Sequence, residues 1–529
     1  MKTTPFAGAS YRLGAALIAA MLATTIPVRQ ASAFVTTSSL GLRDAITSLI
    51  QADEARLGTV GIYVVDAETG RVLMDRNGDR AMIPASNNKL RTTAAALHLL
   101  GPDFRFTTDL MTTAVPTDGT LPGALIVRGG GDPSISGRFE KDKTDITRTM
   151  REFAHAVKEK GIRVIDGGIL LDASYFDREY FHPGWYKDER GEWYEAEIWG
   201  LTFNDNCVDL KWSSKNLNPG DLATFTLNPQ TDYVRLDNRV RVVAKGRPAE
   251  RYYVRDDRSN DIILSGTITV DTEKVDSATV WNGPEFFGSV FRDVLTSEGV
   301  TVRGAVRLLE PGEEKAALAG ARVIATHKSP PLTEIVNVIN LVSQNLYADS
   351  LLKAIGREKA GEGSFAAGIR TVDAFFKEAG IFMDGNKLVD GSGLAAGNRV
   401  SPRQLVETIR HADKGGHHAA WRESLPVGGT RGSLRTRFQQ TTESKALAPD
   451  IMGKTGLIGG VRSLSGIAKN RAGRELYYSI VLNGFKASGS RVIEFIDQTA
   501  VAIAASGEAE EPADAVGPAK DAAPKAAAR

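Results

Sequence analysis

Ser86 and Lys89 stand at the head of an apolar run, and this short stretch constrains the fold more than any other in the sequence. Pro84 precedes it, and the apolar residues recur with helical period until Gly101, a residue type that commonly ends helices. Residues three apart share a helix face, so the Ser86 hydroxyl and the Lys89 amine can meet. A neutral amine at that distance can activate a serine as a nucleophile. The free N–H groups of a first helical turn are also suited to an oxyanion.

Taken alone, Ser86-x-x-Lys89 is weak evidence, because most such pairs are a helix cap followed by a surface lysine. Two further signals follow it in a fixed order, Ser343-Gln344-Asn345 and Lys454-Thr455-Gly456. The first is predicted to lie between two helices, 332–341 and 346–355, and the second on a strand that lines a cleft. Together the three form the set found in class A β-lactamases and penicillin-binding proteins, in which the middle member is Ser-Asp-Asn.

The whole chain after its first 33 residues resembles the D-alanyl-D-alanine carboxypeptidase/D-alanyl-D-alanine-endopeptidase family. These are the class C low-molecular-mass penicillin-binding proteins, which are serine peptidases. The long insert from Gly101 to about Lys328 is typical of that family, since β-lactamases have a much shorter connection there. Further family-like stretches are Gly129–Pro133, Phe203–Asn206, Val389–Leu394 and Leu425–Gly429. The resemblance implies an α/β fold: a penicillin-binding transpeptidase/β-lactamase-like domain, with an antiparallel sheet flanked by helices, and two inserted β-rich subdomains.

The resemblance also implies a catalytic role for five residues. Ser86 attacks the carbonyl of the penultimate D-alanine of a peptidoglycan stem peptide and forms an acyl-enzyme. Lys89 is the general base, provided that burial and the second cation Lys454 disfavour its ammonium form. Ser343 lies between the two lysines and relays a proton to the leaving nitrogen, while Asn345 binds the substrate amide and orients Lys89. Which group performs each proton transfer is disputed across these enzymes.

Substrate binding is implied for the strand motif and the residue after it: Lys454, Thr455, Gly456 and Leu457. Lys454 attracts the C-terminal carboxylate of the stem peptide, and the backbone N–H groups of Ser86 and Leu457 form the oxyanion hole. β-Lactams are implied as covalent inhibitors. No cofactor is implied.

Two positions depart from the family pattern. Leu457 stands where the family commonly has Ser or Thr, so a hydroxyl for the substrate carboxylate is lost while the backbone N–H remains. Thr455 or Arg462 is the hypothesised replacement. Asp349 stands where the family commonly has Glu, a milder change that puts no catalytic residue in doubt.

Two other functions compete with this interpretation. A β-lactamase needs fast deacylation, usually through a water activated by an extra carboxylate, and no glutamate of that kind is identifiable here. A non-catalytic cell-wall-binding protein with a decayed site is the other alternative. The presence of all three motifs argues against decay.

The first 33 residues are predicted to be a secretory signal peptide, which places the protein in the periplasm. Lys2 and Arg12 supply the positive start, residues 13–26 form an apolar stretch, and 31–33 (Ala-Ser-Ala) is a small-x-small cleavage site. The apolar stretch is short for a membrane span. The mature chain is therefore expected to begin at Phe34, without an integral membrane span.

Changes of composition along the chain predict five parts. They are the signal peptide 1–33, a catalytic domain from 34–100 and 329–505, an inserted domain from 101–175 and 280–328, a nested inserted domain 176–279, and a disordered tail 506–529.

Within these parts, several elements follow from hydrophobic periodicity. Residues 38–51 are predicted to form an amphipathic helix, and 59–65 with 71–74 a hairpin. A single strand is expected over 164–171, and a hairpin from 463–468 and 476–482. The aromatic-rich stretch Tyr175–Trp199 is predicted to pack as a loop on a subdomain rather than to cover a ligand.

Composition excludes several kinds of function. The formal net charge of +1 gives no reason to expect nucleic acid as a partner. Cys207 is the only cysteine, so an internal disulfide is excluded and a buried thiol is expected. The histidines His411, His417 and His418 lack the carboxylate spacing of a metal site, so no metal is expected. The oligomeric state is left open.

Overall fold

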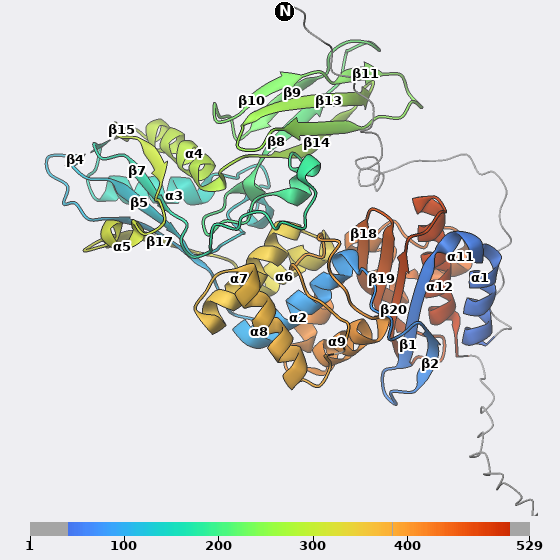
Figure 1. Ribbon diagram of the computed structural model, residues 1–529. Coiled ribbons are helices and arrows are strands. Elements are labelled where there is room, and N and C mark those ends of the chain that lie inside the picture. Colours follow the sequence, from blue (N-terminus) through green and yellow to red (C-terminus); the bar gives the residue numbers. More distant parts are fainter. Residues whose placement is uncertain (1–40, 383, 508–529) are drawn as a thin grey trace, which may run out of the picture.

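The computed structural model describes residues 41–382 and 384–507, so the predicted signal peptide and nearly all of the predicted tail lie outside the described residues. A five-stranded sheet joins the two ends of the described chain, in the order β18-β19-β20-β1-β2. Its strands are β18 (Ile451–Ile458), β19 (Val461–Lys469), β20 (Glu475–Asn483), β1 (Thr59–Asp66) and β2 (Val72–Arg76). All four pairings are antiparallel. Both predicted hairpins are confirmed, as is the antiparallel sheet of the expected fold class (Figure 1).

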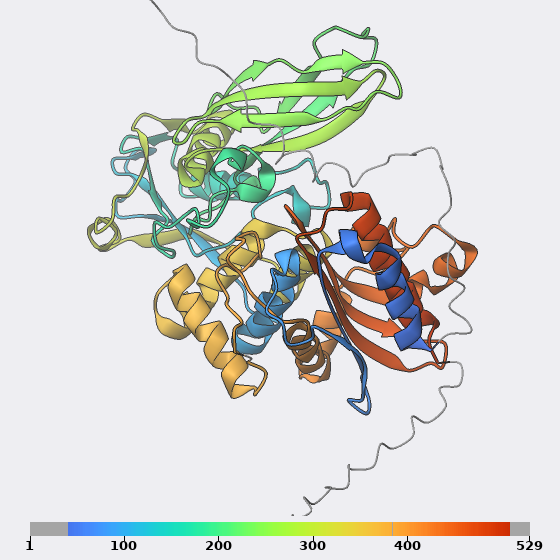
Figure 2. The same ribbon diagram turned by 45° about the vertical axis from the view of Figure 1, so that its right-hand side comes forward.

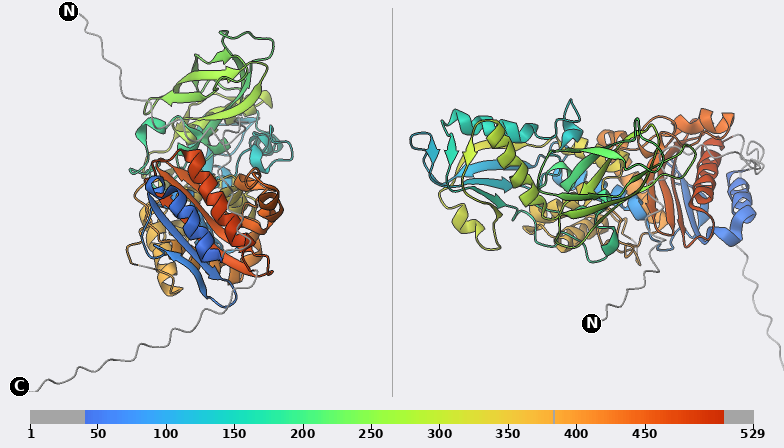
Figure 3. Two further views of the ribbon diagram at one scale, coloured as in Figure 1. Left: turned by 90° about the vertical axis from the view of Figure 1, so that its right-hand side faces the viewer. Right: turned by 90° about the horizontal axis from the view of Figure 1, so that it is seen from above.

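Two helices, α1 (Leu42–Leu57) and α12 (Gly489–Ala505), cover one face of this sheet, as the left view of Figure 3 shows. Their apolar side chains, such as Ile46 and Phe495, pack with strand residues such as Leu464. Residues 38–40 of the predicted helix 38–51 lie outside the described residues. α1 continues past the predicted end at 51, because its chain does not turn until Gly58, whose φ of 66° lies in the left-handed region that favours glycine.

The other face of the sheet is covered by a group of helices around α2 (Figure 2). They are α2 (Asn88–Leu100), α6 (Leu332–Leu341), α7 (Asn345–Ala360), α8 (Phe365–Glu378), α9 (Pro402–Lys414) and α10 (His418–Glu423). α2 is buried along most of its length, from Asn88 to Leu97. The predicted helix is thus present, but a 3₁₀ turn, η4 (Ala85–Asn87), precedes it and carries Ser86.

The first part of the insert is a second five-stranded sheet, in the order β16-β7-β5-β3-β17, packed against two helices. These elements are β16 (Val306–Leu308), β7 (Ile169–Asp172), β5 (Leu125–Gly129), β3 (Thr107–Thr112), β17 (Arg322–Lys328), α3 (Arg148–Glu159) and α4 (Gly283–Ser297). A small parallel sheet lies beside them, formed by β15 (Thr301–Val302), β6 (Val164–Ile165) and β4 (Thr120–Leu121).

The single strand predicted over 164–171 is wrong. The chain forms two strands there, β6 and β7, which belong to different sheets. Gly168 separates them with a φ of 79°, and a Cβ at that position would collide with the Ala305 carbonyl. The apolar periodicity continues across the break, so it did not reveal the turn.

The second part of the insert consists of two further sheets, which lie at the top of Figures 1 and 2. One is antiparallel and contains β14 (Glu273–Thr279), β8 (Cys207–Ser213) and β9 (Thr224–Asn228). The other centres on β13 (Asp261–Thr269), which pairs with β10 (Arg235–Asn238), β11 (Arg241–Val243) and β12 (Arg251–Arg255). The predicted domain boundaries stay a prediction.

Seen from above, the insert occupies the end of the molecule opposite α1 (right view of Figure 3). Within the described ranges, no helix combines the length and the apolar character that a membrane span requires.

Candidate active site

Two of the three sequence motifs meet at the amine of Lys89. Its Nζ lies 3.0 Å from the Ser86 Oγ, 2.6 Å from Asn345 Oδ1 and 2.8 Å from the carbonyl oxygen of Ser392. The first two contacts join η4 to the start of α7, as the motif spacing predicted. Ser392 was not predicted as a partner. Three segments far apart in sequence therefore surround one amine.

Burial sets the charge state of Lys89. Its side chain has no exposed surface, and desolvation lowers the pKa of the amine to about 7, against the opposing effect of the carboxylates Asp349 and Asp390. A large share of the molecules therefore carries a neutral amine at neutral pH. That amine can accept a proton from the Ser86 hydroxyl.

A second buried amine, that of Lys454, contacts Ser343. Its Nζ donates to the Ser343 Oγ at 2.8 Å and to the Thr455 carbonyl at 2.9 Å. Burial, followed by the charge of Lys89, lowers the pKa of Lys454 well below its ordinary value. Ser343 sits at the end of α6 with a φ of 64°. The Ser343 hydroxyl thus contacts the amine of Lys454. Its loop leads directly to Asn345, which contacts the amine of Lys89.

Asp349 orients the carbonyl that Lys89 contacts. Its Oδ1 accepts the N–H groups of Gly391 and Ser392 at 2.7 and 3.1 Å, which fixes the turn that carries the Ser392 carbonyl. Burial, followed by the charge of Asp390, raises the pKa of the Asp349 carboxyl. The shorter Asp in place of the family's usual Glu still reaches this turn from α7.

Asp390 holds the same turn together from inside. Its two carboxylate oxygens accept four hydrogen bonds, of 2.6 to 2.9 Å, and the donors are the backbone N–H groups of Gly393 and Ala395, Asn398 Nδ2 and Trp185 Nε1. The carboxylate is fully buried. Trp185 belongs to the insert, so Asp390 links the insert to the turn whose Ser392 carbonyl contacts Lys89.

Gly456 allows the strand motif to pass close to Ser86. A Cβ at this position would lie 2.7 Å from the Pro84 carbonyl and 3.1 Å from the Ser86 backbone nitrogen. Ser463 Oγ on β19 donates to that Pro84 carbonyl at 2.7 Å, which holds the turn against the sheet. The Ser86 N–H therefore lies beside the strand that presents Leu457.

A cavity of about 400 Å³ opens over these residues. Ser86, Ser343 and Asn345 line it, and the fully buried Lys89 and Lys454 lie beneath them. The remaining lining residues are Trp193, Tyr194, Leu341, Val342, Leu394, Gly432, Ser433, Arg435, Thr436, Thr455, Leu457 and Ile458.

Thr455 and Arg462, the two hypothesised replacements for the hydroxyl that Leu457 lacks, lie in different surroundings. The buried Arg462 donates from Nη1 to the carbonyls of Ile458 and Val461, and it is not among the residues lining the cavity. Thr455 does line the cavity, and its Oγ1 lies 2.8 Å from the Ser433 Oγ. The exposed Arg435, two residues further on, adds a cation to the same wall.

Sequence reasoning missed Ser433 and Arg435 because their segment carries no motif of its own. The one nearby signal was the family-like stretch Leu425–Gly429, which ends four residues before Ser433. Only the packing of this segment against β18 shows that the two side chains share the cavity.

The expectation that Tyr175–Trp199 serves only as loop packing is wrong at two residues. Trp193 and Tyr194 line the cavity, and the Tyr194 carbonyl accepts a 2.8 Å hydrogen bond from Asn345 Nδ2. Because Asn345 also holds Lys89, the insert fixes the orientation of a central residue of the site.

The remaining candidates lie apart from this site. Cys207 is buried in β8, and desolvation raises the pKa of its thiol, which disfavours the reactive thiolate. The ring of His411 packs near those of His98 and Phe375. Across residues 41–382 and 384–507, no group of three or more His, Cys, Asp or Glu side chains could hold a metal ion.

Comparisons with known proteins agree with this geometry. The family model described as "D-Ala-D-Ala carboxypeptidase 3 (S13) family" matches residues 42–505. The D-alanyl-D-alanine carboxypeptidase of Actinomadura sp. (strain R39) is 32% identical over 474 residues, which are 88% of this chain and 84% of that protein. The D-alanyl-D-alanine carboxypeptidase DacB of Haemophilus influenzae is 25% identical over 430 residues, 80% and 85% of the two chains.

Among solved structures, penicillin binding protein 4 (dacB) from Haemophilus influenzae has the same fold, with a TM-score of 0.73 and 23% identity. The match covers 86% of this chain and 97% of that one. A second structure of that protein, complexed with a novel β-lactam, matches with a TM-score of 0.67.

The role of Asp390 as a structural hub gives a test. Asp390→Ala leaves three buried donors without an acceptor, the N–H groups of Gly393, Ala395 and the Trp185 indole, while Asn398 Nδ2 keeps the Ala395 carbonyl. The loss should destabilise the protein by about 3 kcal/mol or more. The measurement is the midpoint of chemical and thermal unfolding. The exposed Asp188, in the 3₁₀ turn η6 (Lys187–Glu189) that follows Trp185, provides the matched control. Asp188→Ala should change stability by less than about 0.5 kcal/mol, and equal effects of the two substitutions would contradict the hub role.

Proposed function

This chain belongs to the D-Ala-D-Ala carboxypeptidase 3 (S13) family, and on that premise we propose that Ser86 is its acylated nucleophile. The reaction is hydrolysis of the D-Ala-D-Ala end of peptidoglycan stem peptides, or of the cross-link that replaces it. One observation carries the assignment: the Lys89 amine lies 3.0 Å from the Ser86 hydroxyl, in a setting where burial lowers its pKa to about 7.

In the first step, Ser86 Oγ attacks the carbonyl carbon of the penultimate D-alanine and passes its proton to Lys89. Asn345 Oδ1 and the Ser392 carbonyl hold the amine in place. Both accept hydrogen bonds from its other protons, so the lone pair of the neutral form is directed at the serine. The result is an ester on Ser86 and a protonated Lys89.

In the second step, the leaving nitrogen takes up a proton as the peptide bond breaks. Ser343 is placed to deliver it, because its hydroxyl contacts Lys454 and lines the cavity. The two lysines repel each other when both are charged, which favours release of a proton toward the substrate. The proton that Lys89 took from Ser86 replaces the one delivered to the leaving nitrogen, so Lys89 is neutral again when the leaving group departs. Water then attacks the ester carbonyl and passes a proton to Lys89. Lys89 returns that proton to Ser86 Oγ as the ester bond breaks, which releases the shortened peptide as a carboxylic acid.

The negative charge on the carbonyl oxygen is stabilised by two backbone N–H groups, those of Ser86 and Leu457. Their proximity is possible because Gly456 has no side chain. Fixed donors of this kind are among the largest single contributions to acyl-transfer catalysis.

The C-terminal carboxylate of the substrate is recognised by Ser433, Thr455 and Arg435. The paired hydroxyls replace the one that Leu457 lacks, and Arg435 supplies a charge that reaches the cavity. Lys454, buried beneath the cavity wall, adds positive potential in its protonated form. Arginine is well suited to binding a carboxylate through two parallel hydrogen bonds.

The lining of the cavity favours a penicillin-sensitive peptidase over a β-lactamase. Of the residues that the structure places around it, none is Asp or Glu. A carboxylate that could activate a hydrolytic water is therefore missing from this set, and a penicilloyl ester on Ser86 should persist.

A periplasmic location belongs to the same proposal. The supporting feature is the predicted signal peptide over residues 1–33. The substrate, peptidoglycan, is found outside the cytoplasmic membrane.

The experiment that tests this function combines two measurements on the wild type and Ser86→Ala. Intact-mass spectrometry with benzylpenicillin should show one long-lived adduct on the wild type and none on the variant. Release of D-alanine from a stem pentapeptide should be lost in the variant. Consumption of penicillin without an adduct would indicate a β-lactamase, and neither adduct nor consumption would favour the non-catalytic alternative.

Gly456→Ala tests the oxyanion hole. The added methyl group displaces β18 from the Ser86 turn, so acylation by a fluorescent penicillin should slow by about 100-fold, the cost of losing one oxyanion donor. Gly459 lies on the same hairpin, and a Cβ there meets nothing within 4 Å. Gly459→Ala should acylate at the wild-type rate; if Gly456→Ala does the same, the proposed hole is wrong.

Arg435→Ala tests carboxylate recognition. The kcat/KM for a stem peptide ending in D-Ala-D-Ala should fall about tenfold, while that for the corresponding D-Ala-D-Ala amide should change less than about twofold. The amide lacks the charge that Arg435 recognises. Arg370→Ala, at an arginine whose side chain is 65% exposed on α8, is the matched control. Equal losses on the acid and the amide would rule out a carboxylate role.

A further inference from the structure

A second cavity, of about 440 Å³, adjoins the active-site cavity. The two share Trp193 and Val342 in their walls. The other lining residues come mostly from the insert: Gly137, Arg138, Lys143, Ile146, Asn204, Asp205, Cys207, Asp209, Val275, Ser277 and Val338. An extended ligand that passes Trp193 can therefore occupy both cavities.

Charged groups of both signs face this second cavity. Arg138 binds one oxygen of Asp205, with Nε and Nη2 each 2.7 Å from Oδ2. The same oxygen accepts a hydrogen bond from Gln344 Nε2 at 2.9 Å. The other oxygen, Oδ1, is buried and has no partner among the described residues. Asp205, itself only 8% exposed, therefore anchors the guanidinium of Arg138 in the cavity wall.

The opposite charge is available nearby. Lys143 is exposed and donates one proton to the Arg138 carbonyl at 2.6 Å, which leaves two more for a ligand. The side chain of Arg138 is 38% exposed. Asp209 completes the set, and its carboxylate accepts from Ser277 Oγ at 2.6 Å. A carboxylate and an amino or amide N–H of one ligand both find partners here.

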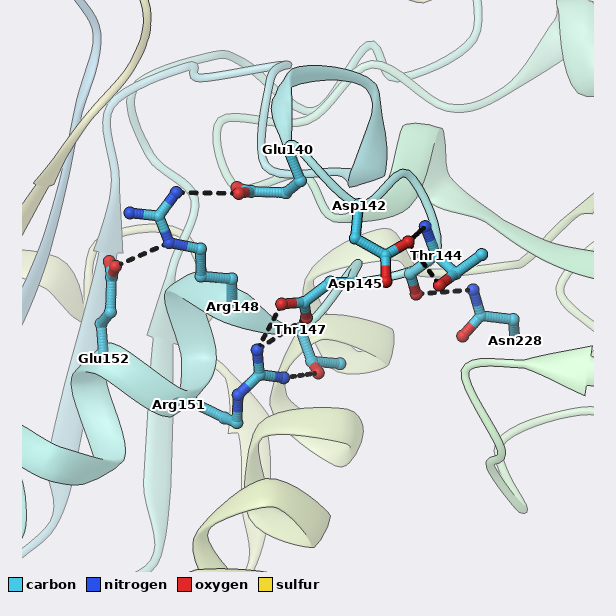
Figure 4. Close-up of polar contacts among 9 residues, drawn as sticks. All are labelled: Glu140, Asp142, Thr144, Asp145, Thr147, Arg148, Arg151, Glu152 and Asn228. Carbon is cyan, nitrogen blue, oxygen red and sulfur yellow. Dashed lines mark hydrogen bonds and ion pairs between the residues drawn. The ribbon is translucent and has the colours of Figure 1, made fainter.

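The wall that carries Lys143 and Ile146 is braced by a network of ion pairs and hydrogen bonds, which Figure 4 shows. Its contacts are Glu140–Arg148 at 2.8 Å, Arg148–Glu152 at 3.0 Å, Asp145–Arg151 at 2.6 Å, and the Thr144 carbonyl with Asn228 Nδ2 at 3.2 Å. The last contact links this wall to β9 in the second part of the insert. The segment that carries Lys143 and Ile146 is therefore held to the sheet of β8, β9 and β14.

The cavity also has a direct connection to catalysis. Gln344, which bonds Asp205, lies between the two functional residues of its motif, Ser343 and Asn345. A ligand that contacts Asp205 is thus one hydrogen bond away from the loop that carries both.

We propose that this second cavity binds the non-reacting stem peptide of a cross-linked pair while Ser86 attacks the cross-link. This inference rests on the proposed function. A single D-alanine leaving group needs only the first cavity. A second stem peptide carries a carboxylate and N–H groups, which match the cations and carboxylates of the cavity lining. The cavity volume of about 440 Å³ lies within the usual range for ligand sites.

A bulky substitution on β14, in the wall of the second cavity, tests the proposal. Val275 lies on β14, is 65% exposed and lines the cavity. Val275→Trp adds bulk there without touching the three motifs. The matched control is Lys274→Trp, because the neighbouring residue of a strand points to the opposite face. Substrates are a monomeric stem pentapeptide and a cross-linked tetrapeptide–tetrapeptide dimer, together with benzylpenicillin as a reporter of acylation.

The expected result is that Val275→Trp lowers kcat/KM for the dimer by about tenfold or more, while the pentapeptide and penicillin rates change less than about twofold. Lys274→Trp should leave all three rates unchanged. Lys143→Ala removes an exposed cation together with its hydrogen bond to the Arg138 carbonyl. It should weaken binding of the dimer to the Ser86→Ala protein in calorimetry and leave pentapeptide binding unchanged.

Three results overturn the inference. Val275→Trp with an unchanged dimer rate shows that the cavity is not used, and equal losses on the dimer and the pentapeptide show a general effect on the fold. Wild-type protein that is acylated by penicillin and cleaves the pentapeptide, but not the dimer, also contradicts it while sparing the proposed function. Failure of the proposed function is distinct, since penicillin then leaves no adduct on Ser86.

Discussion

The buried amine of Lys89 is the interaction on which the site depends. A charged lysine is costly to bury unless it is paired or neutralised. Here its three hydrogen-bond partners are a serine hydroxyl, an amide oxygen and a backbone carbonyl. None of these carries a formal charge, so the contacts hold the amine in place without fixing its proton. Burial of this amine costs folding free energy, and it also lowers the pKa of the amine to about 7, so that a neutral amine is available as a base at neutral pH.

The surroundings of this amine explain why the fold is built as it is. α2 is buried against the sheet, so the Lys89 side chain is shielded from bulk solvent. Gly456 brings β18 against the turn of Ser86. The insert is also part of the site, since Trp185 bonds Asp390 and the Tyr194 carbonyl bonds Asn345. A chain that lacked the insert would lose one wall of the cavity and two supports of the junction.

Local patterns in the sequence predicted the parts of this site that depend on local structure. The helix that follows Ser86, the loop with Ser343 and the strand with Lys454 each have a periodic or turn signal of their own. Ser392, Ser433 and Arg435 have none, because their positions depend on long-range packing of loops. The break at Gly168 was missed for a related reason, since apolar residues continue on both sides of it. Leu457 was recognised as a departure, but the contact between Ser433 and Thr455, from which we propose its compensation, joins two segments far apart in the sequence.

The most direct test is to titrate Lys89 itself. In protein whose lysines carry ¹³C at Cε, the resonance of Lys89 is identified by its loss in Lys89→Met, and its chemical shift is followed with pH by NMR. It should titrate at a pKa of about 7, whereas exposed lysines titrate above pH 10. A Lys89 resonance that also titrates above pH 10 would contradict the claim that burial makes this amine the base for Ser86.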